Sequence, residues 1–309
     1  VNMQTILGSN GQIGQELARC LHADFGAQIR LVSRRPRQVH PSDEVLPADL
    51  LQAEQASAAV AGSETAYLTA GLPMDTRLWE EQWPLLMQNV IRACSEHGTR
   101  LVYFDNTYMY PQTAEPQTES TPFQPYGPKG RVRAAITEQL LQAMARGELQ
   151  ALICRAPEFY GPGLTQSITN STVIQPLKAG KAAKVFLRDD TLRSLIYTPD
   201  ASRAMALLGQ TEDAYGQSWH LPCDDERLSY RQFVALAAEV FGVPARHTIL
   251  KAWQLRLAGC FSRTIRDAAE LLPRYRVDNI FVSDKFRLYP GSPCSGLSGA
   301  CDQKMPTDP

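Results

Sequence analysis

A tyrosine and a lysine stand three residues apart in the stretch FQPYGPKGRVRAAITEQLL, residues 123–141. A phenol can donate or accept a proton when a nearby cation moves its pKa from about 10 toward neutrality. Residues three or four apart share one helix face, so Tyr126 and Lys129 form a candidate catalytic pair. Pro128 suits the first helical position and disfavours helical angles at Gly127. The pair is therefore expected at the junction between a loop and a helix.

A glycine-rich turn near the start of the chain offers a second kind of chemistry. The segment ILGSNGQIGQEL carries glycines at 8, 11 and 14, after an apolar run and before a helical pattern. In such a turn the first glycine permits the bend, the second admits a pyrophosphate, and the third allows close helix–strand packing. The helix N-terminus then attracts phosphate. The pattern predicts a dinucleotide site with contacts from Gly8, Asn10, Gly11, Gln12, Ile13 and Gly14.

The end of the next apolar run, LVSRRP, bears on which dinucleotide would bind. Ser33 stands near the position where NAD sites carry an acid, and Arg34 and Arg35 follow it. A guanidinium can bind a ribose 2′-phosphate that an acid would repel, so NADP(H) is predicted over NAD. The alternative is a solvated arginine pair. Farther on, Asp49 beside Leu50 is a candidate contact for adenine or a helix cap.

The periodicity of the first half predicts the elements that position these residues. Strands are expected at 3–8, 28–34, 65–70, 100–105 and 150–156, and helices at 11–23, 77–98 and 131–147. Strands separated by helices form a parallel sheet with helices on both faces. The expected fold is therefore α/β, a Rossmann-type doubly wound parallel sheet.

Beyond residue 165 the pattern changes to short strands mixed with helices, including one helix expected near 251–272. This change predicts a smaller C-terminal α/β substrate domain at 165–289, packed on a dinucleotide-binding domain at 1–164. The segment 195–210 is expected to pack back on the first domain. Residues 290–309 are rich in Gly, Ser and Pro and lack periodicity, which predicts a disordered tail.

Composition limits the possible partners. The chain has 309 residues, a net charge of −1 and seven irregularly spaced cysteines. The near-neutral charge predicts no nucleic-acid partner. No apolar run reaches the roughly 20 residues of a membrane span, and no membrane partner is predicted. The cysteine spacing and the lack of a recognisable secretion signal predict a reduced, cytoplasmic protein without a metal site.

Several segments together resemble the extended short-chain dehydrogenase/reductases, the NAD-dependent epimerase/dehydratase family. Besides the glycine turn they are YLTAG at 67–71, MQNVIRAC at 87–94, RAPEFYGPG at 155–163 and RSLIYTPDASRAM at 193–205. The resemblance covers residues 3–289. It implies a Rossmann fold with a C-terminal substrate domain, nucleotide sugars as the usual substrates, and Thr69, Ala70 and Gly71 beside the nicotinamide ribose. Relatives often dimerise through the helices at 77–98 and 131–147, so a homodimer is possible.

The same resemblance implies a tyrosine as general acid or base and a lysine one helical turn later. Two alignments of this pair compete. One keeps Tyr126 and Lys129. The other is anchored on ITEQLL, which is similar to the family's helix, and it puts Gly130 at the tyrosine position and Ala134 at the lysine position. In the second alignment both catalytic groups are absent.

Further positions are expected to contact the substrate. Asn106 occupies the slot of the family's Ser or Thr, and Thr107 follows it. The residues expected to contact substrate are Tyr108, Tyr160 and Arg193; the family arginine often contacts a substrate diphosphate. Tyrosines at 108, 110, 126 and 160 are the candidate proton donors. The sequence thus predicts an atypical NADP(H)-dependent oxidoreductase or epimerase for a small carbonyl or hydroxyl compound, with a nucleotide sugar among the candidate substrates; the alternative is a non-catalytic NADP(H)-binding sensor.

Overall fold

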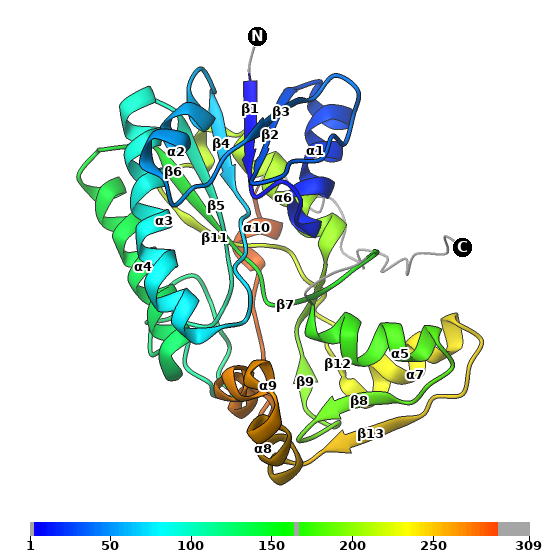
Figure 1. Ribbon diagram of the computed structural model, residues 1–309. Coiled ribbons are helices and arrows are strands. Elements are labelled where there is room, and N and C mark those ends of the chain that lie inside the picture. Colours follow the sequence, from blue (N-terminus) through cyan, green and yellow to red (C-terminus); the bar gives the residue numbers. More distant parts are fainter. Residues whose placement is uncertain (1–2, 164–166, 290–309) are drawn as a thin grey trace.

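The computed structural model describes residues 3–163 and 167–289, and seven parallel strands form its central sheet (Figure 1). The strand order is β11-β6-β5-β4-β1-β2-β3, and every neighbouring pair is parallel. The strands are β1 (Met3–Leu7), β2 (Gln28–Ser33), β3 (Glu44–Pro47), β4 (Thr65–Leu68), β5 (Arg100–Asp105), β6 (Ala151–Arg155) and β11 (Ser218–His220). The predicted Rossmann-type parallel sheet is confirmed.

Helices cover both faces of this sheet because its strands are apolar on both sides. Ile6 and Leu7, neighbours in β1, belong to opposite hydrophobic clusters, as the twofold alternation of a strand requires. One face carries α1 (Gln12–Phe25) and α6 (Thr198–Gly209). The other carries α2 (Ala53–Val60), α3 (Thr76–His97) and α4 (Gly127–Ala145).

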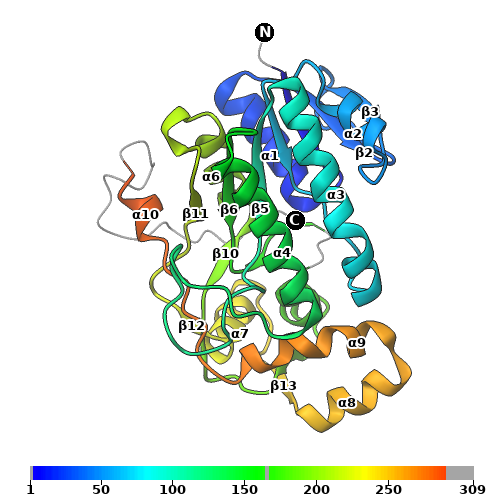
Figure 2. The same ribbon diagram turned by 90° about the vertical axis from the view of Figure 1, so that its left-hand side faces the viewer.

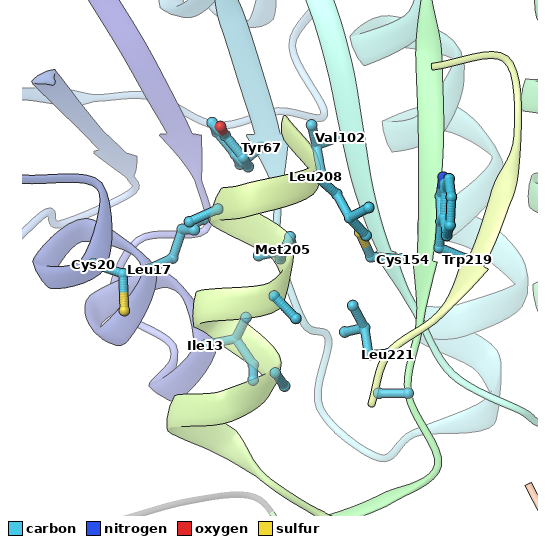
Figure 3. Close-up of a cluster of buried hydrophobic side chains, with 14 of the residues drawn as sticks. Ile13, Leu17, Cys20, Tyr67, Val102, Cys154, Met205, Leu208, Trp219 and Leu221 are labelled. Carbon is cyan, nitrogen blue, oxygen red and sulfur yellow. The ribbon is translucent and has the colours of Figure 1, made fainter. Parts of the chain in front are cut away.

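Helix α6 belongs to this sheet although it comes late in the chain. Met205 and Leu208 on α6 lie against Ile13 and Leu17 of α1 and against the strands beneath (Figure 3). A helix from the later part of the chain therefore completes the core of the large sheet. Its N-terminus lies beside the glycine turn, which matters for the site below.

The remaining elements form a smaller unit at the carboxyl edge of the sheet (Figure 1). Its two-stranded pairings are parallel for β7–β10 and β8–β13 and antiparallel for β9–β12. The elements are β7 (Glu158–Tyr160), η1 (Asn170–Ile174), α5 (Gln175–Lys178), β8 (Ala183–Phe186), β9 (Leu192–Arg193), β10 (Leu195–Tyr197), β12 (Leu228–Ser229), α7 (Tyr230–Val240) and β13 (His247–Leu250). A separate cluster around Val173, Phe233 and Tyr275 fills its core.

After β13 the chain forms a series of short helices. The segment expected as one helix near 251–272 is instead α8 (Ala252–Phe261), α9 (Arg263–Ala268) and η3 (Ala269–Tyr275). Ser262 ends α8, and its side chain caps α9, so the break has a local cause. A short turn η2 (Glu212–Ala214) precedes β11, and α10 (Asp284–Arg287) ends the described chain. The predicted domain boundary stays a prediction, and the expected tail at 290–309 lies outside the described residues.

Candidate functional site

The glycine turn is shaped by two close backbone approaches at the end of β1. Gly8 has a φ of +93°, and a Cβ there would lie 2.4 Å from the Cα of Ala70. At Gly14 a Cβ would lie 3.0 Å from both the Cα of Ser9 and the Oγ1 of Thr69. Gly11 precedes α1 without a side-chain cap. The first N–H groups of α1 are therefore left to a ligand, which fits a dinucleotide pyrophosphate.

The turn lies where the strand order reverses. From β1 the chain proceeds to β2 and β3 on one side and to β4 and β5 on the other. Ligands of open α/β sheets bind at the carboxyl ends of strands at this point. Thr69 follows β4 and donates its hydroxyl to the carbonyl of Leu7 at 3.2 Å. Ala70 lies against Gly8, and Gly71 beside it is exposed, so the structure brings these sequence-predicted residues together.

Two side chains of the turn tie it to neighbouring loops. The Nδ2 of Asn10 donates to the Arg35 carbonyl at 2.7 Å, and its Oδ1 accepts from the Arg37 N–H at 3.1 Å. The Nε2 of Gln12 donates to the Oγ1 of Thr198 at 2.7 Å, at the start of α6. Ile13 is buried in the core. Asn10 thus holds the arginine loop against the glycine turn.

The arginine loop presents two unengaged guanidinium groups. Arg34 and Arg35 are exposed, and within the described residues their guanidinium groups form no hydrogen bond or ion pair. The Ser33 hydroxyl accepts from the Arg35 N–H at 3.2 Å and shapes the bend. Asp49 accepts from the N–H of Leu51 and lies ahead of α2, which begins at Ala53. Leu50, between them, is buried.

The sequence-predicted pair Tyr126 and Lys129 is not joined. Tyr126 stands at the N-cap of α4 with a 55% exposed side chain. The Lys129 side chain is fully buried. Its ammonium donates to the Oγ1 of Thr76 at 2.6 Å, the carbonyl of Asp267 at 2.5 Å and the Oε1 of Glu270 at 2.9 Å. The lysine holds α3, α4 and the η3 segment together, and this geometry does not support an acid/base pair with Tyr126.

The alternative alignment also leaves the helix without catalytic groups. A Cβ at Gly130 would lie 2.7 Å from the carbonyl oxygen of Tyr108 and 3.1 Å from the Cβ of Pro125. A tyrosine at this position would therefore clash. Ala134 is buried in a small cluster with Met109 and Tyr110. Neither alignment leaves a tyrosine beside a lysine on this helix.

A different tyrosine stands at the end of β5. The Oδ1 of Asn106 accepts from the Tyr108 N–H at 2.9 Å and fixes the loop; Thr107 is buried there. The Tyr108 ring lies 6.1 Å from the Trp79 ring, stacked at 19°, and the Arg274 guanidinium carbon lies 5.6 Å from its centroid. Its hydroxyl has no hydrogen-bond partner among the described residues.

The electrostatic surroundings of Tyr108 favour its neutral form. Burial raises the pKa of the phenol, while the guanidinium groups of Arg274 and Arg133 oppose that effect. A neutral phenol can donate a proton, and the two cations would stabilise the phenolate that remains. The sequence predicted Tyr108 as a substrate contact and a candidate proton donor, whereas Arg274 and Arg133 beside it lie 166 and 25 residues farther along the chain.

A buried charge cluster that the sequence did not predict lies beneath this loop. The Asp105 carboxylate is 3.6 Å from Arg133 and 3.4 Å from Arg155, and it accepts from the Thr137 hydroxyl at 3.0 Å. All four side chains are buried. The cluster joins β5, β6 and α4 and fixes the strand end that carries Asn106 and Tyr108. The only sequence signal was a charged residue ending each of two apolar strands.

The cluster continues through a histidine whose protonation can be assigned. The Nδ1 of His220 lies 2.7 Å from the Val282 carbonyl, so this nitrogen donates. Its Nε2 then accepts from the Tyr110 hydroxyl at 2.7 Å, and Tyr110 accepts from Arg155 at 2.6 Å. Burial lowers the pKa of His220 to about 3. The histidine is thus neutral and structural near pH 7.

Arg193 lies in a second buried cluster rather than at an open surface. Its side chain is fully buried, 3.2 Å from the Glu158 carboxylate and 2.7 Å from the Arg274 carbonyl. Glu158 also accepts from the Tyr230 hydroxyl at 2.6 Å. Burial acts to raise the pKa of Glu158, but Arg193 and Arg274 hold it below its ordinary value. Tyr160, the other predicted substrate contact, is buried against Phe233.

Two negative findings apply to the part of the chain that the structure describes. None of its helices is long and apolar enough to cross a membrane. None of its His, Cys, Asp and Glu side chains gather in threes around a potential metal position.

Solved structures share this fold at low sequence identity. A putative epimerase from Burkholderia cenocepacia superposes with a TM-score of 0.74 at 18% identity, covering 94% of this chain and 92% of its own. A UDP-glucose 4-epimerase from Thermus thermophilus, solved with NAD, has a TM-score of 0.69 at 16% identity, with 89% and 99% covered. A dTDP-glucose 4,6-dehydratase from Streptomyces venezuelae, also with NAD, has 0.68 at 17%, with 87% and 97% covered.

A search of curated proteins finds no match to this chain. The family comparison is more informative, because a family model matches residues 5–220, which include the glycine turn, the arginine loop, β5 and α6. By this match the chain belongs to the NAD dependent epimerase/dehydratase family.

Proposed function

We propose that this protein is an NADP(H)-dependent oxidoreductase that acts on a small carbonyl or hydroxyl compound. The observation that carries the proposal is the pairing of the glycine turn with the arginine loop. Asn10 holds the two segments together, and the guanidinium groups of Arg34 and Arg35 have no hydrogen-bond or ion-pair partner among the described residues. Guanidinium groups at the end of β2 suit a 2′-phosphate, which NADP(H) has and NAD(H) lacks.

The proton in this reaction would come from Tyr108. When bound, the reduced dinucleotide supplies a hydride to a carbonyl carbon, and the protein supplies a proton to the carbonyl oxygen. Tyr126 is exposed and Lys129 is engaged with Glu270, so neither suits that task. The Tyr108 hydroxyl is unpaired among the described residues and lies near two guanidinium groups. Asn106, in the slot of the family's hydroxyl residue, would orient the substrate oxygen.

The surroundings of Arg193 favour a small substrate over a nucleotide sugar. The structural neighbours include a UDP-glucose 4-epimerase and a dTDP-glucose 4,6-dehydratase. In this chain Arg193 is buried with Glu158 and is not free to meet a diphosphate. Breaking a buried pair of this kind costs several kcal/mol, about 3–5. A substrate without a diphosphate avoids that cost.

A non-catalytic NADP(H) sensor is the second candidate function. It is favoured by the absence of a lysine-assisted tyrosine on α4, because Gly130 and Ala134 carry no reactive groups. In this case the dinucleotide would shift a conformational equilibrium of the protein, and a partner protein would recognise one of the conformations. The sensor binds NADPH without consuming it, whereas the oxidoreductase oxidises it when a suitable aldehyde or ketone is added.

Calorimetric titration with NADPH and then NADH tests the cofactor assignment. We expect tighter binding of NADPH and a loss of at least about tenfold in Arg34→Asp. Arg92→Asp is the matched control, because Arg92 is exposed on the outer side of α3 and makes only a 3.8 Å pair with Glu96. Tighter binding of NADH would refute the NADP(H) preference, and no binding of either at millimolar concentration would refute the function.

The cellular setting is part of the same proposal. Four thiols among the described residues are buried and unpaired, at Cys20, Cys94, Cys154 and Cys223. Unpaired thiols favour a reducing, cytoplasmic location. A homodimer through α3 and α4 remains a proposal, and light scattering of the purified chain would test it.

A further inference from the structure

A pair of short helices carries four exposed large apolar side chains, and one of them, Phe261, is the most exposed large apolar side chain in the described part of the chain. Helices α8 and α9 form a hairpin beneath α3 and α4, and their connecting turn points away from the rest of the molecule (Figures 1 and 2). The exposed fractions are 61% for Trp253, 55% for Leu257, 88% for Phe261 and 38% for Ile265. We call these four residues the hairpin patch. Trp253, Leu257 and Phe261 are spaced four residues apart and share one face of α8, and Ile265 follows on α9.

The hairpin patch is not the core-facing side of α8. Leu255 and Gly259 form that side and are buried. Helix α8 rests on α9 and η3, and a Cβ at Gly259 would lie 3.4 Å from the Cα of Arg266. The inward face of the helix is therefore already in close contact. The outward face is a second apolar surface that no described residue covers, which marks it as an interaction site.

Basic side chains surround the hairpin patch. Lys251, Arg256, Arg263 and Arg266 are all exposed. The nearby carboxylate of Asp267 is largely buried and lies 3.7 Å from Arg263 and 4.0 Å from Arg266. Lys251 and Arg256 have no ion-pair partner in the described part of the chain. The chain as a whole has a net charge of −1, and Lys251 and Arg256 supply the unpaired positive charge at this surface, since Arg263 and Arg266 lie near carboxylates.

We propose that the hairpin patch docks the protein on an anionic lipid bilayer. Tryptophan, phenylalanine and leucine on one face, with lysine and arginine beside them, match a helix that lies in the membrane interface. Each basic side chain near an anionic leaflet adds to the attraction. A second copy docked on the same patch would bring like charges together, which opposes a symmetric dimer there. The proposed contact is peripheral and needs no membrane-spanning helix, in keeping with the absence of one among the described residues.

The hairpin is anchored firmly enough to orient the molecule. Arg263 lies 3.2 Å from Asp75 at the start of α3, and Lys129 of α4 reaches Glu270 just beyond α9. These contacts link the hairpin to the carboxyl edge of the sheet. Docking would therefore turn that edge toward the bilayer. The proposal does not depend on the dinucleotide assignment.

Vesicle binding by the full chain tests the proposal. The probes are vesicles of phosphatidylcholine alone and vesicles that also contain phosphatidylserine. Trp79, Trp83 and Trp219 are buried, so Trp253 is the exposed tryptophan whose emission can respond. We expect co-sedimentation with the phosphatidylserine vesicles and a shift of tryptophan emission to shorter wavelength. High salt should release the protein, because it screens surface charge.

Point variants separate the apolar and the charged contributions. Phe261→Ser should weaken partitioning about tenfold, from the loss of one large inserted side chain. Arg256→Glu should weaken it on phosphatidylserine vesicles by a similar factor, roughly tenfold. Leu288→Ser is the matched control, because Leu288 is 80% exposed but lies outside the hairpin. Circular dichroism of each variant verifies that it is folded.

Three outcomes would overturn the proposal. The first is that neither vesicle type binds the protein. The second is equal binding to both vesicle types with no effect of Arg256→Glu, which would remove the charge argument. The third is self-association in lipid-free buffer that Phe261→Ser abolishes, which would assign the hairpin patch to a second copy of the chain instead.

Discussion

Replacing Lys129 by methionine distinguishes a structural lysine from a catalytic one. The ammonium is fully buried and bonded to Thr76, Asp267 and Glu270. Methionine keeps the length of the side chain but leaves the Glu270 carboxylate, itself only 10% exposed, without its cation. Removing one partner of a buried ion pair costs about 3–5 kcal/mol. That is a large part of the roughly 5–15 kcal/mol that stabilises a typical domain.

Urea unfolding followed by circular dichroism measures this loss. A second variant, Lys129→Met with Glu270→Leu, removes both charges and should recover most of the stability, because no uncompensated charge remains. NADPH affinity should be unchanged in the double variant, since both side chains lie away from the glycine turn. A Lys129→Met protein that loses under about 1 kcal/mol but all turnover would refute the structural assignment and restore the lysine to the catalytic site.

Three further predictions concern the turn, the proton donor and acid stability. Gly8→Ala should destabilise the protein by about 1–3 kcal/mol or more and abolish NADPH binding, because the new Cβ would lie 2.4 Å from the Cα of Ala70. Gly26→Ala is the control in thermal unfolding, because Gly26 also has a positive φ but its Cβ would have no atom within 4 Å. Tyr108→Phe should keep NADPH affinity in calorimetry and lose at least about 100-fold in turnover, and Tyr126→Phe should lose little; the reverse pattern would contradict the assignment. In the folded protein the pKa of His220 is lowered to about 3, whereas in the unfolded chain it is about 6.5. The neutral imidazole therefore contributes its full stabilisation above a pH of about 6.5, and the stability of the protein falls as the pH drops from about 6.5 toward 3. His220→Gln should flatten that fall in urea midpoints measured at several pH values, and an unchanged slope would count against the assignment.

The candidate site combines a glycine turn that fits a dinucleotide with a helix α4 whose lysine is already engaged. A Cβ at Gly8 or Gly14 would lie 3.0 Å or less from neighbouring atoms, so the shape of the turn requires glycine at both positions. By contrast, the lysine near the start of α4 is buried in an ion pair with Glu270, and the loop after β5 lies too close to Gly130 for a tyrosine there. Tyr108 comes from that same loop. A relocated proton donor is therefore consistent with the loss of the usual helix positions.

Short-range patterns in the sequence account for the parts of the fold that were predicted correctly. The alternation of apolar runs and helical patterns predicted the parallel sheet, because both periodicities follow from local backbone geometry. The sequence missed the short strands β3 and β7, which are only four and three residues long. It also joined α8, α9 and η3 into one helix, although Ser262 caps a new helix in between.

The sequence by itself determined the glycine turn, the arginine loop and the order of strands and helices, since each depends on neighbouring residues. Only the tertiary structure decided what the charged side chains do. Lys129 forms an ion pair with Glu270, 141 residues away in the sequence, and Arg193 forms one with Glu158, 35 residues away. A buried charge requires a partner, and packing rather than spacing determines which one lies within reach. For that reason the spacing of Tyr126 and Lys129 did not reveal that the lysine bonds to Glu270, and only the fold brings Arg133 and Arg274 near Tyr108.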